Sequence, residues 1–284
     1  MLPSGQAREA LYKAVMTMPL RLAIAGCAGR MGRQLASAAL ATGHTISGGS
    51  EAPGAEALGQ DIGRLAGGEP IGVVVTDNLQ QAASGAAAWL DFTVPQATLS
   101  VLRVLPEQGV RAAVIGTTGF TTTQEQDIAH AASNLAIVKA GNFSLGVNLL
   151  EALVRQAAAR LGEDWDIEIA ETHHKHKIDA PSGTALMLGE AAAKGRGKAL
   201  NDLRIAPYDG PDVKRGPGEI GFSVRRTGGV IGDHEVTIGS EMEVLSLRHT
   251  AIDRAVFAHG AIKAAEWAAQ QSPGLYDMSD VLGV

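Results

Sequence analysis

The segment Arg21-Leu-Ala-Ile-Ala-Gly-Cys-Ala-Gly-Arg-Met-Gly32 decides the fold of this chain. A short apolar run stops at Gly26, glycine recurs at every third position, and a helical stretch follows over Arg33–Leu40. A second short run near His44–Ser47 ends at Gly48-Gly49-Ser50-Glu51. A strand, a glycine-rich turn, a helix and a second strand in this order form a βαβ unit, which builds parallel sheets.

The same alternation continues over the first ~140 residues. We expect further strands and helices at Ile71–Val75, Ala88–Phe92, Ala97–Leu105 (helix), Arg111–Ile115, Gln124–Ser133 (helix) and Leu135–Val138. The first half of the chain is therefore predicted to be an α/β domain with a doubly wound parallel sheet.

The second half has a different pattern. A long amphipathic helix should follow Asn142-Phe143-Ser144, run through Leu161 and end at Gly162 in a left-handed cap. The remaining segments read as a strand, a helix, three alternating strands and an Ala-rich helix, at Trp165–Thr172, Thr184–Ala193, Ile220–Arg226, His234–Ile238, Met242–Arg248 and Arg254–Gln271. This order predicts an α+β domain with a mixed or antiparallel sheet.

Composition excludes several classes of function. The 284 residues carry 24 Lys and Arg against 30 Asp and Glu, a net charge of −6, and few aromatics, which argues against nucleic acid as a main partner. No apolar run approaches the ~18 residues of a membrane span. The single cysteine, Cys27, fits a reducing compartment, so we expect a soluble cytoplasmic protein. Residues 1–19 are expected to be an N-terminal extension, with Met16 or Met18 as alternative starts.

The glycine-rich turn has the chemistry of a pyrophosphate site. Glycines let the backbone approach the phosphates, and the N–H groups that open a helix receive their charge. Ala28 and Met31 depart from the strict dinucleotide motif, so a tight turn made for packing is the alternative. Glu51 stands near the offset expected for an acid that binds the ribose hydroxyls. Because Ala52 follows it rather than an arginine, NADH should bind at least as well as NADPH, although Arg30 and the nearby Arg33 could still help with a phosphate.

The densest chemical signal is the segment Glu171–Ala185, in which three of the eight histidines and two lysines lie close together. A zinc site is one interpretation, but no cysteine joins it and the segments near His234 and His249 lack ligand spacing. A solvated polar loop is the second. An acid–base site for an anionic substrate fits best, because histidine titrates near neutrality and lysines favour a bound carboxylate.

The end of this segment supports an anion site. Ser182 or Thr184 is expected to cap the following helix, whose first N–H groups would then be open to a carboxylate. A dinucleotide domain and a cationic, proton-donating pocket together indicate a reductase of an acidic small molecule. Two alternatives remain open: a regulatory dinucleotide-binding protein without chemistry, and an amino-acid or imino-acid dehydrogenase on a similar two-domain plan.

The pattern E-x-H-H-x-x-K-x-D-x-P-S-G-T-A, present as Glu171 to Ala185, resembles the signature of the 4-hydroxy-tetrahydrodipicolinate reductase (dihydrodipicolinate reductase) family. The resemblance covers nearly the whole chain from about Leu20. It includes AGCAGRMGRQL at the glycine turn, DFTVP at 91–95, IGTTGF at 115–120, NFSLGVNLL at 142–150 and GLYDMSDVL at 274–282.

The resemblance implies a Rossmann-like cofactor domain over residues 20–143, completed by 254–284. It also implies a substrate-binding and oligomerisation domain over 144–253, whose open sheet forms the core of a homotetramer. The implied reaction is the NAD(P)H-dependent reduction of 4-hydroxy-tetrahydrodipicolinate to tetrahydrodipicolinate with loss of water, in lysine and diaminopimelate biosynthesis. The family's common arginine after the ribose acid is missing at Ala52, in agreement with the charge argument.

The resemblance also assigns roles to single residues. His173 matches the proton donor and acceptor of the family and Lys177 a proton donor, while the implied substrate contacts are His174, Gly183 and Thr184. No metal is implied. The implied cofactor contacts are Gly26, Cys27, Ala28, Gly29, Arg30 and Met31 at the pyrophosphate, Glu51 at the ribose, and Gly116, Thr117, Thr118, Ala140, Gly141, Asn142 and Phe143 on the nicotinamide side.

Overall fold

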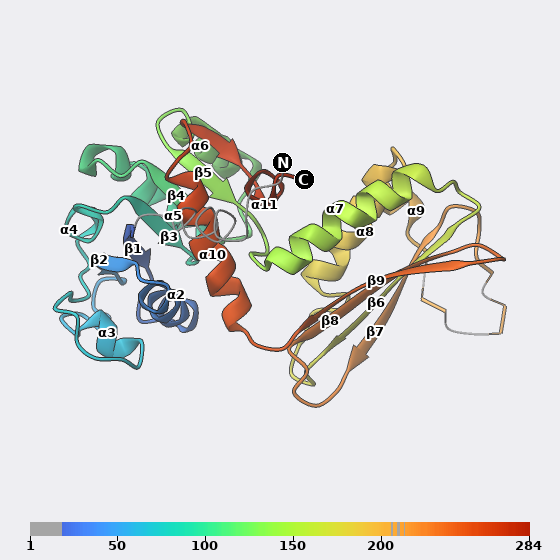
Figure 1. The fold of residues 1–284 in the computed structure, drawn as a ribbon, viewed down its shortest axis with the longest axis horizontal. Helices are drawn as coiled ribbons and strands as arrows, with labels where there is room; N and C mark the ends of the chain where they lie inside the picture. Colours follow the sequence, from blue (N-terminus) through green and yellow to red (C-terminus); the bar gives the residue numbers. More distant parts are fainter. Residues whose placement is uncertain (1–18, 206, 209–210, 213) are drawn as a thin grey trace, which may run out of the picture. The chain divides into compact units, whose positions relative to one another are not determined.

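The computed structural model describes residues 19–284 except 206, 209–210 and 213 (Figure 1). Contacts divide the chain into two compact units. Unit 1 contains the residues up to Ala140 together with Ala258–Asp277, and unit 2 contains Gly141–Phe257 with Met278–Val284. The expected N-terminal extension, with Met16 and Met18, lies outside the described residues apart from its last position.

Unit 1 is built on a six-stranded parallel sheet of strand order β10-β5-β4-β3-β1-β2. The predicted doubly wound, Rossmann-like fold is thereby confirmed. Its strands are β1 (Arg21–Ala25), β2 (Thr45–Ser50), β3 (Ala88–Asp91), β4 (Ala112–Ile115), β5 (Ala136–Lys139) and β10 (Gly274–Tyr276).

The inner strands β1, β3, β4 and β5 of unit 1 are almost completely buried, as expected for a parallel sheet between helices. On one face Trp89, Ala113 and Ile137 join a core with residues of α4, α5 and α6, and on the other Ile24 and Val114 are equally buried. The helical segments are α2 (Arg30–Ala41), α3 (Ile62–Leu65), α4 (Leu79–Ala83), α5 (Pro95–Leu102), the short 3₁₀ turn η1 (Leu105–Gln108), α6 (Thr122–Ala131) and most of α10 (Ala255–Ala268).

The strand expected at Ile71–Val75 is wrong. This segment makes a single isolated bridge, Val74 with Asp61, and the next residue, Thr76, makes another with Ser50, so no ladder forms. The reason is local, because the Asp61 carboxylate accepts hydrogen bonds from the backbone N–H groups of Ile71 and its neighbour and holds the segment in a loop.

Unit 2 has a four-stranded mixed sheet of order β7-β6-β8-β9, covered on one face by α7 and α8 (Figure 1). The first pair is parallel and the other two are antiparallel, which confirms the mixed sheet. Its elements are α7 (Leu145–Arg160), β6 (Asp166–His173), α8 (Gly183–Gly195), α9 (Leu200–Leu203), β7 (Ile220–Arg226), β8 (Gly232–Gly239), β9 (Val244–Ala251) and α11 (Met278–Leu282).

The side chains that α7 and α8 cover alternate along each strand. Ile167 and Ile169 on β6, with Val236 and Ile238 on β8, form the core, and the next inward positions toward the end of β6 are polar. The left-handed cap expected at Gly162 is wrong. The helix α7 ends at Arg160, its C-cap Leu161 is extended, and Gly162 does not have a positive φ.

Candidate active site

The glycine-rich turn joins β1 to α2 and leaves the start of that helix open. Gly26 has φ +59°, which favours glycine, and Gly29 is an N-cap without a side-chain hydrogen bond. A Cβ added to Gly32 would lie 2.1 Å from the Gly26 carbonyl oxygen. The helix therefore packs directly against the turn, and the N–H groups of its first turn remain without a side-chain cap. This geometry fits a pyrophosphate.

Glu51 follows β2 and contacts the same turn. Its Oε1 accepts a hydrogen bond of 2.9 Å from the Ala28 N–H. The neighbouring Cys27 is fully buried, and burial, together with the Glu51 charge, raises the pKa of its thiol to about 12, so this thiol stays neutral.

A cavity of about 510 Å³ opens beside the turn and is lined by Gly26, Glu51, Asp77 and Asp91, among others. Among the described residues that line it there is no lysine or arginine. Two buried polar atoms of lining residues, Asp91 Oδ2 and Trp89 Nε1, have no hydrogen-bond partner in the described part of the chain. A cavity lined by an acid that follows the second strand, with unpaired polar atoms and an open helix start, fits a nicotinamide dinucleotide.

The predicted segment Gly116–Thr118 follows β4 in the same sheet, and the side chain of Thr117 is already engaged. It is 3 % exposed, donates to Asp91 Oδ1 at 3.2 Å and accepts from the Thr93 N–H at 3.0 Å. Any contact that Thr117 makes with a cofactor would therefore use its backbone.

The last predicted cofactor segment crosses the boundary between the units. Ala140 follows β5 in unit 1, whereas Gly141, Asn142 and Phe143 belong to unit 2. Asn142 donates a hydrogen bond of 3.1 Å from Nδ2 to the Thr184 hydroxyl, and Phe143 is almost fully buried.

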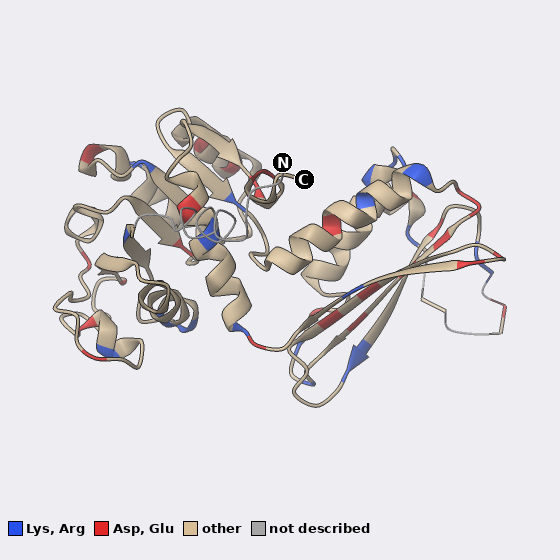
Figure 2. Ribbon diagram, in the orientation of Figure 1, with Lys and Arg blue, Asp and Glu red and all other residues tan. Residues whose placement is uncertain are grey.

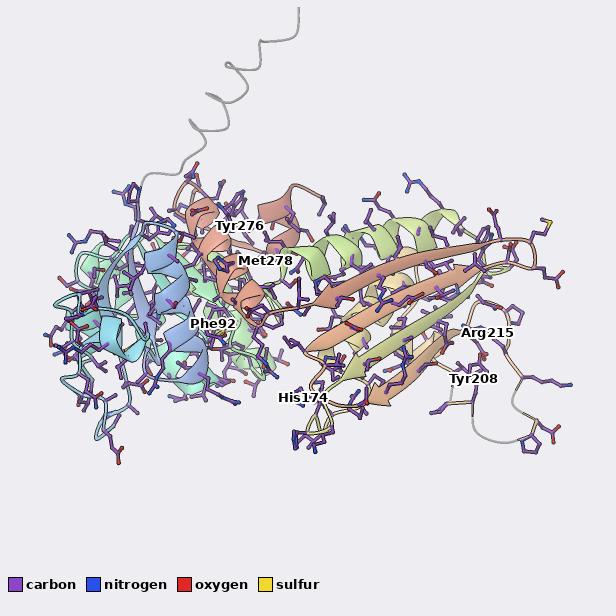
Figure 3. All side chains as sticks on the ribbon, turned by 60° about the horizontal axis from the view of Figure 1, so that its bottom comes forward. Phe92, His174, Tyr208, Arg215, Tyr276 and Met278 are labelled. Carbon is purple, nitrogen blue, oxygen red and sulfur yellow. The ribbon has the colours of Figure 1, made fainter. Side chains whose placement is uncertain are left out.

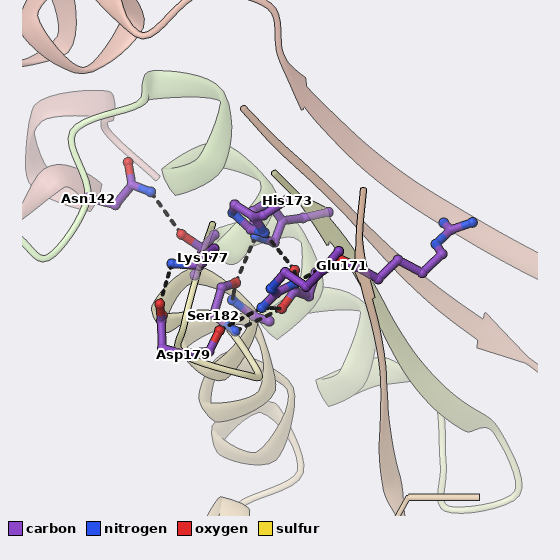
Figure 4. Close-up of polar contacts among 11 residues, drawn as sticks. Asn142, Glu171, His173, Lys177, Asp179 and Ser182 are labelled. Carbon is purple, nitrogen blue, oxygen red and sulfur yellow. Dashed lines mark hydrogen bonds and ion pairs between the residues drawn. The ribbon is translucent and has the colours of Figure 1, made fainter. Parts of the chain in front are cut away.

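In unit 2 the end of β6 carries a buried carboxylate and histidine (Figure 4). Glu171 Oε2 lies 2.6 Å from His173 Nδ1, and Arg226 donates to both carboxylate oxygens at 2.7 and 2.8 Å. The Ser182 N–H donates to Oε1 at 3.0 Å. Burial by itself raises the pKa of the Glu171 carboxyl, but these hydrogen bonds outweigh it and hold the pKa below its usual value.

His234, on the adjacent strand β8, completes this cluster. Its ring meets that of His173 edge to face at 5.0 Å, and its Nε2 lies 3.1 Å from the Ser182 hydroxyl. Burial, reinforced by the nearby His173, lowers the pKa of His234 to about 4, so this ring is neutral at pH 7.

The loop after β6 carries further basic residues, of which Lys177 and His174 are half-buried. Lys177 Nζ pairs with Asp179 Oδ1 at 2.8 Å, and this pairing lowers the pKa of the Asp179 carboxyl (Figure 4). Partial desolvation and the positive charges of Arg254 and neighbouring side chains lower the pKa of His174.

Helix α8 begins directly beside the histidines. Ser182 is its N-cap, and the hydroxyl accepts from the Ala185 N–H at 3.2 Å, which confirms Ser182 rather than Thr184 as the cap. The earlier N–H groups, those of Gly183 and Thr184, have no side-chain cap, and Gly183 is exposed. Unit 2 thus places His173, His174, Lys177, Gly183 and Thr184 around one loop and one helix start.

Sequence reasoning missed three members of this cluster: the carboxylate role of Glu171, the anchoring Arg226 and the buried His234. The signal was the register of the strands. Pairing of β6 with β8 sets Glu171 opposite His234, and pairing with β7 sets His173 opposite Arg226. That register is set by long-range pairing, which periodicity within one segment does not reveal.

Within the ranges described above, no group of three or more histidine, cysteine or acidic side chains could hold a metal ion. No helix in the same ranges is both long and apolar enough to cross a membrane.

Comparison with known proteins gives matches over both units. Residues 20–143 match the family model described as dihydrodipicolinate reductase, N-terminus, and residues 146–282 match dihydrodipicolinate reductase, C-terminus. A relative from Parvibaculum lavamentivorans, named 4-hydroxy-tetrahydrodipicolinate reductase, is 50 % identical over 95 % of this chain and 100 % of its own length. One of the same name from Cereibacter sphaeroides is 48 % identical over 93 % and 98 %.

Solved structures agree. A dipicolinate-bound dihydrodipicolinate reductase from Paenisporosarcina sp. TG-14 superposes with a TM-score of 0.72 at 25 % identity, over 92 % of this chain and 98 % of that one. An amine dehydrogenase from Mycobacterium smegmatis, 16 % identical with a TM-score of 0.63 over 91 % and 94 % of the two chains, shares the fold alone. Because family models match both halves of the chain and a relative named 4-hydroxy-tetrahydrodipicolinate reductase is 50 % identical, this chain belongs to the dihydrodipicolinate reductase family.

Proposed function

We propose that this protein reduces 4-hydroxy-tetrahydrodipicolinate to tetrahydrodipicolinate with a nicotinamide cofactor and with loss of water, as a step of lysine and diaminopimelate biosynthesis. The observation that carries the proposal is the pairing of Glu171 with His173 beside the open start of α8, within a chain of this family. A proton donor next to an anion site is what the reduction of a cyclic dicarboxylate needs.

The substrate carboxylates are proposed to bind at the start of α8. The N–H groups of Gly183 and Thr184 would receive one carboxylate, and His174 and Lys177 would supply positive charge beside it. Lys177 is held by Asp179 at 2.8 Å, so a bound carboxylate would compete with Asp179 for this ammonium group.

The cofactor is proposed to bind to the domain formed by residues 20–143 and completed by 254–284. The substrate is proposed to bind to the domain formed by residues 144–253. Gly26–Met31 would hold the pyrophosphate, Glu51 the ribose, and Gly116–Thr118 with Ala140–Phe143 the nicotinamide side. The acids that line the cavity, Glu51 and Asp77 among them, would repel a 2′-phosphate, so NADH is proposed to serve at least as well as NADPH.

A bound nicotinamide supplies the hydride that the reduction consumes. Hydride addition to a ring carbon conjugated to an imine builds negative charge, which the Lys177 ammonium or a protonated His173 would stabilise. The resulting enamine carbon then takes a proton from His173. Nε2 is the ring atom available for this step, because it makes no hydrogen bond in the described part of the chain and is not sealed from solvent.

We also propose that the protein is a homotetramer and acts in the cytoplasm. Support for assembly comes from unit 2, whose sheet ends on two edge strands, β7 and β9, the second exposed over most of its length. Unpaired edges are surfaces on which copies of a chain can associate. Figure 2 shows both signs of charge on this sheet, which suits complementary contacts between copies.

The test is oxidation of NADH and NADPH, followed by absorbance, with substrate generated from pyruvate and aspartate semialdehyde by a dihydrodipicolinate synthase. His173→Gln and Lys177→Ala should each keep NADH binding and lose about 10²-fold or more in kcat. The exposed neighbours His176→Gln and Lys175→Ala are the matched controls and should keep the wild-type rate.

Two outcomes would contradict the proposal. A near-wild-type kcat for either active-site variant would remove the assigned chemistry. If the protein binds NADH but oxidises neither cofactor, the function becomes that of a regulatory dinucleotide-binding protein or of a dehydrogenase of monocarboxylate amino or imino acids.

A further inference from the structure

We infer that Glu171, anchored by Arg226 and the Ser182 N–H, is the positioning residue of His173, and that it fixes the ring so that Nδ1 keeps its proton and Nε2 exchanges one with the substrate. This inference rests on the proposed function, in which His173 is the proton donor. Glu171 acts on the reaction through His173 and does not itself contact the substrate.

The hydrogen bonds around Glu171 determine where the protons are. Each carboxylate oxygen faces two groups. Oε1 lies against the Ser182 N–H and one Arg226 nitrogen. Oε2 lies against the other Arg226 nitrogen and His173 Nδ1. Arginine and the backbone N–H can only donate. An ionised carboxylate can only accept, so Nδ1 must be the donor in the 2.6 Å contact.

Arg226 keeps the carboxylate in that ionised state. Glu171 is 1 % exposed, and such burial alone favours the neutral acid. The bidentate contact from Arg226 reverses this preference, and the pKa of Glu171 lies below its usual value. A proton on the pair therefore resides on His173 and not on Glu171.

With Nδ1 fixed, the proton transfer has one route. In the imidazolium form the Nε2–H bond breaks, a C–H bond forms at the enamine carbon, and the ring becomes the neutral Nδ1–H tautomer. Water then returns a proton to Nε2. The side of the ring near Nε2 is kept free by Gly232, where an added Cβ would lie 3.1 Å from that atom.

Other charged and titratable groups around His173 do not replace Glu171. His234 faces it from β8 but is neutral at pH 7, because burial lowers its pKa to about 4. Arg226 on β7 is committed to the carboxylate, and His174 and Lys177 in the following loop are cationic or neutral. In the described surroundings of the ring, Glu171 is thus the anion that contacts it.

Glu171→Gln is the sharpest variant, because its single oxygen cannot satisfy all the donors. If the amide NH₂ took the place of Oε1, it would face the Ser182 N–H and an Arg226 nitrogen, neither of which can accept a hydrogen bond. With its NH₂ at the Oε2 position it would face Arg226 and His173 Nδ1, and the ring can respond by giving up the Nδ1 proton. The variant should therefore convert neutral His173 to the Nε2–H tautomer, which cannot take up a proton at Nε2.

Glu168→Gln is the matched control. Glu168 lies on the same strand and also pairs with an arginine, accepting from Arg215 at 3.0 Å, with a further hydrogen bond from Ser223 at 2.7 Å. Figure 3 shows Arg215 at the opposite end of the sheet from His174. Loss of this pair removes a similar ionic contact without touching His173.

The experiment is ¹⁵N NMR of protein labelled at histidine, with the His173 signals assigned by their loss in His173→Gln, together with kcat and KM over a pH series. In wild type, neutral His173 should carry its proton on Nδ1, and in Glu171→Gln on Nε2. The variant should lose on the order of 10²–10⁴-fold in kcat with an unchanged KM for NADH. The pH above which kcat falls should also move lower, and Glu168→Gln should change none of these.

Each possible failure has a distinct meaning. A wild-type His173 with its proton on Nε2, or a Glu171→Gln variant with wild-type kcat and pH profile, overturns the inference. The wild-type spectrum decides the tautomer even if the variant does not fold. Failure of wild-type protein to oxidise NADH with substrate overturns the proposed function instead, and the tautomer assignment is judged on its own spectrum.

Discussion

The packing of α2 against the glycine turn makes Gly32→Ala the most informative change in unit 1. The new Cβ would lie 2.1 Å from the Gly26 carbonyl oxygen and 2.6 Å from the Cys27 Cα, both backbone atoms. Since carbon and oxygen come no closer than about 3.3 Å in ordinary weak contacts, the helix and the turn must separate by about 1 Å.

Two opposing terms decide the sign of the stability change. Alanine is favoured over glycine inside a helix by about 1 kcal/mol. Forcing an extra methyl into a packed site costs about 1–3 kcal/mol and more where backbone must move. Because every close atom here belongs to the backbone, the second term should dominate, and the variant should be less stable by about 1–2 kcal/mol.

The same displacement should damage the cofactor site, since a shift of about 1 Å in a positioned group costs on the order of 10²-fold in rate. The assays are thermal unfolding and titration of NADH followed by fluorescence. Gly29→Ala is the graded comparison, because its Cβ would lie 3.1 Å from the same oxygen and requires a far smaller shift. An equal or higher Tm for Gly32→Ala, with unchanged NADH affinity, would refute this account of the turn.

Three further predictions concern the cofactor cavity and the histidine cluster. Ala52→Arg adds a cation beside Glu51 in the cavity and should lower the KM for NADPH with little change in the KM for NADH. Ala55→Arg, at a residue that does not line the cavity, should not lower the KM for NADPH. Equal NADPH kinetics in the two variants would count against the proposed position of the ribose site. Gly232→Ala should lower kcat because its Cβ crowds His173 Nε2 at 3.1 Å, without loss of NADH binding, and an unaffected kcat would show that Nε2 is not the reacting atom. The pKa of His234 is about 4 in the folded protein, against an ordinary value near 6.5, so the unfolded chain takes up this proton first as the pH falls. The free energy of unfolding should therefore decrease by about 2–3 kcal/mol as the pH drops from 6.5 to 4. Denaturant unfolding of His234→Gln should show a flatter pH dependence, and the same slope as in wild type would contradict the burial of this ring.

The sequence predicted the fold where its signals are local. The strand–turn–helix order at Gly26 follows from apolar runs and glycines, and the cap of α8 at Ser182 follows from hydroxyl chemistry at a helix start. Gly162 misled the prediction because a glycine after a helix need not adopt positive φ, and here the chain leaves α7 already extended at Leu161. The run at Ile71 was apolar enough for a strand, but its first two N–H groups, those of Ile71 and Gly72, donate to the Asp61 carboxylate.

The active-site cluster was only partly predictable. His173 and Lys177 stand out in the sequence, whereas the partners that orient His173 come from three strands and a helix start. Arg226 is 55 positions from Glu171, and Ser182 is 11. Strand β10 was missed for a related reason, since three residues carry no periodicity and pair with β5 only through the finished sheet.

The proposed reduction is tested most directly by the transfer of deuterium to the product from NADH labelled at the reactive nicotinamide carbon. The reaction with 4-hydroxy-tetrahydrodipicolinate would be analysed by mass spectrometry of the products. Tetrahydrodipicolinate should gain a single deuterium when NADH carries the label on the face from which hydride is transferred, and His173→Gln should form this product at least about 10²-fold more slowly. If NADH binds but tetrahydrodipicolinate gains no deuterium from NADH labelled on either face of the nicotinamide ring, the proposed reduction is contradicted.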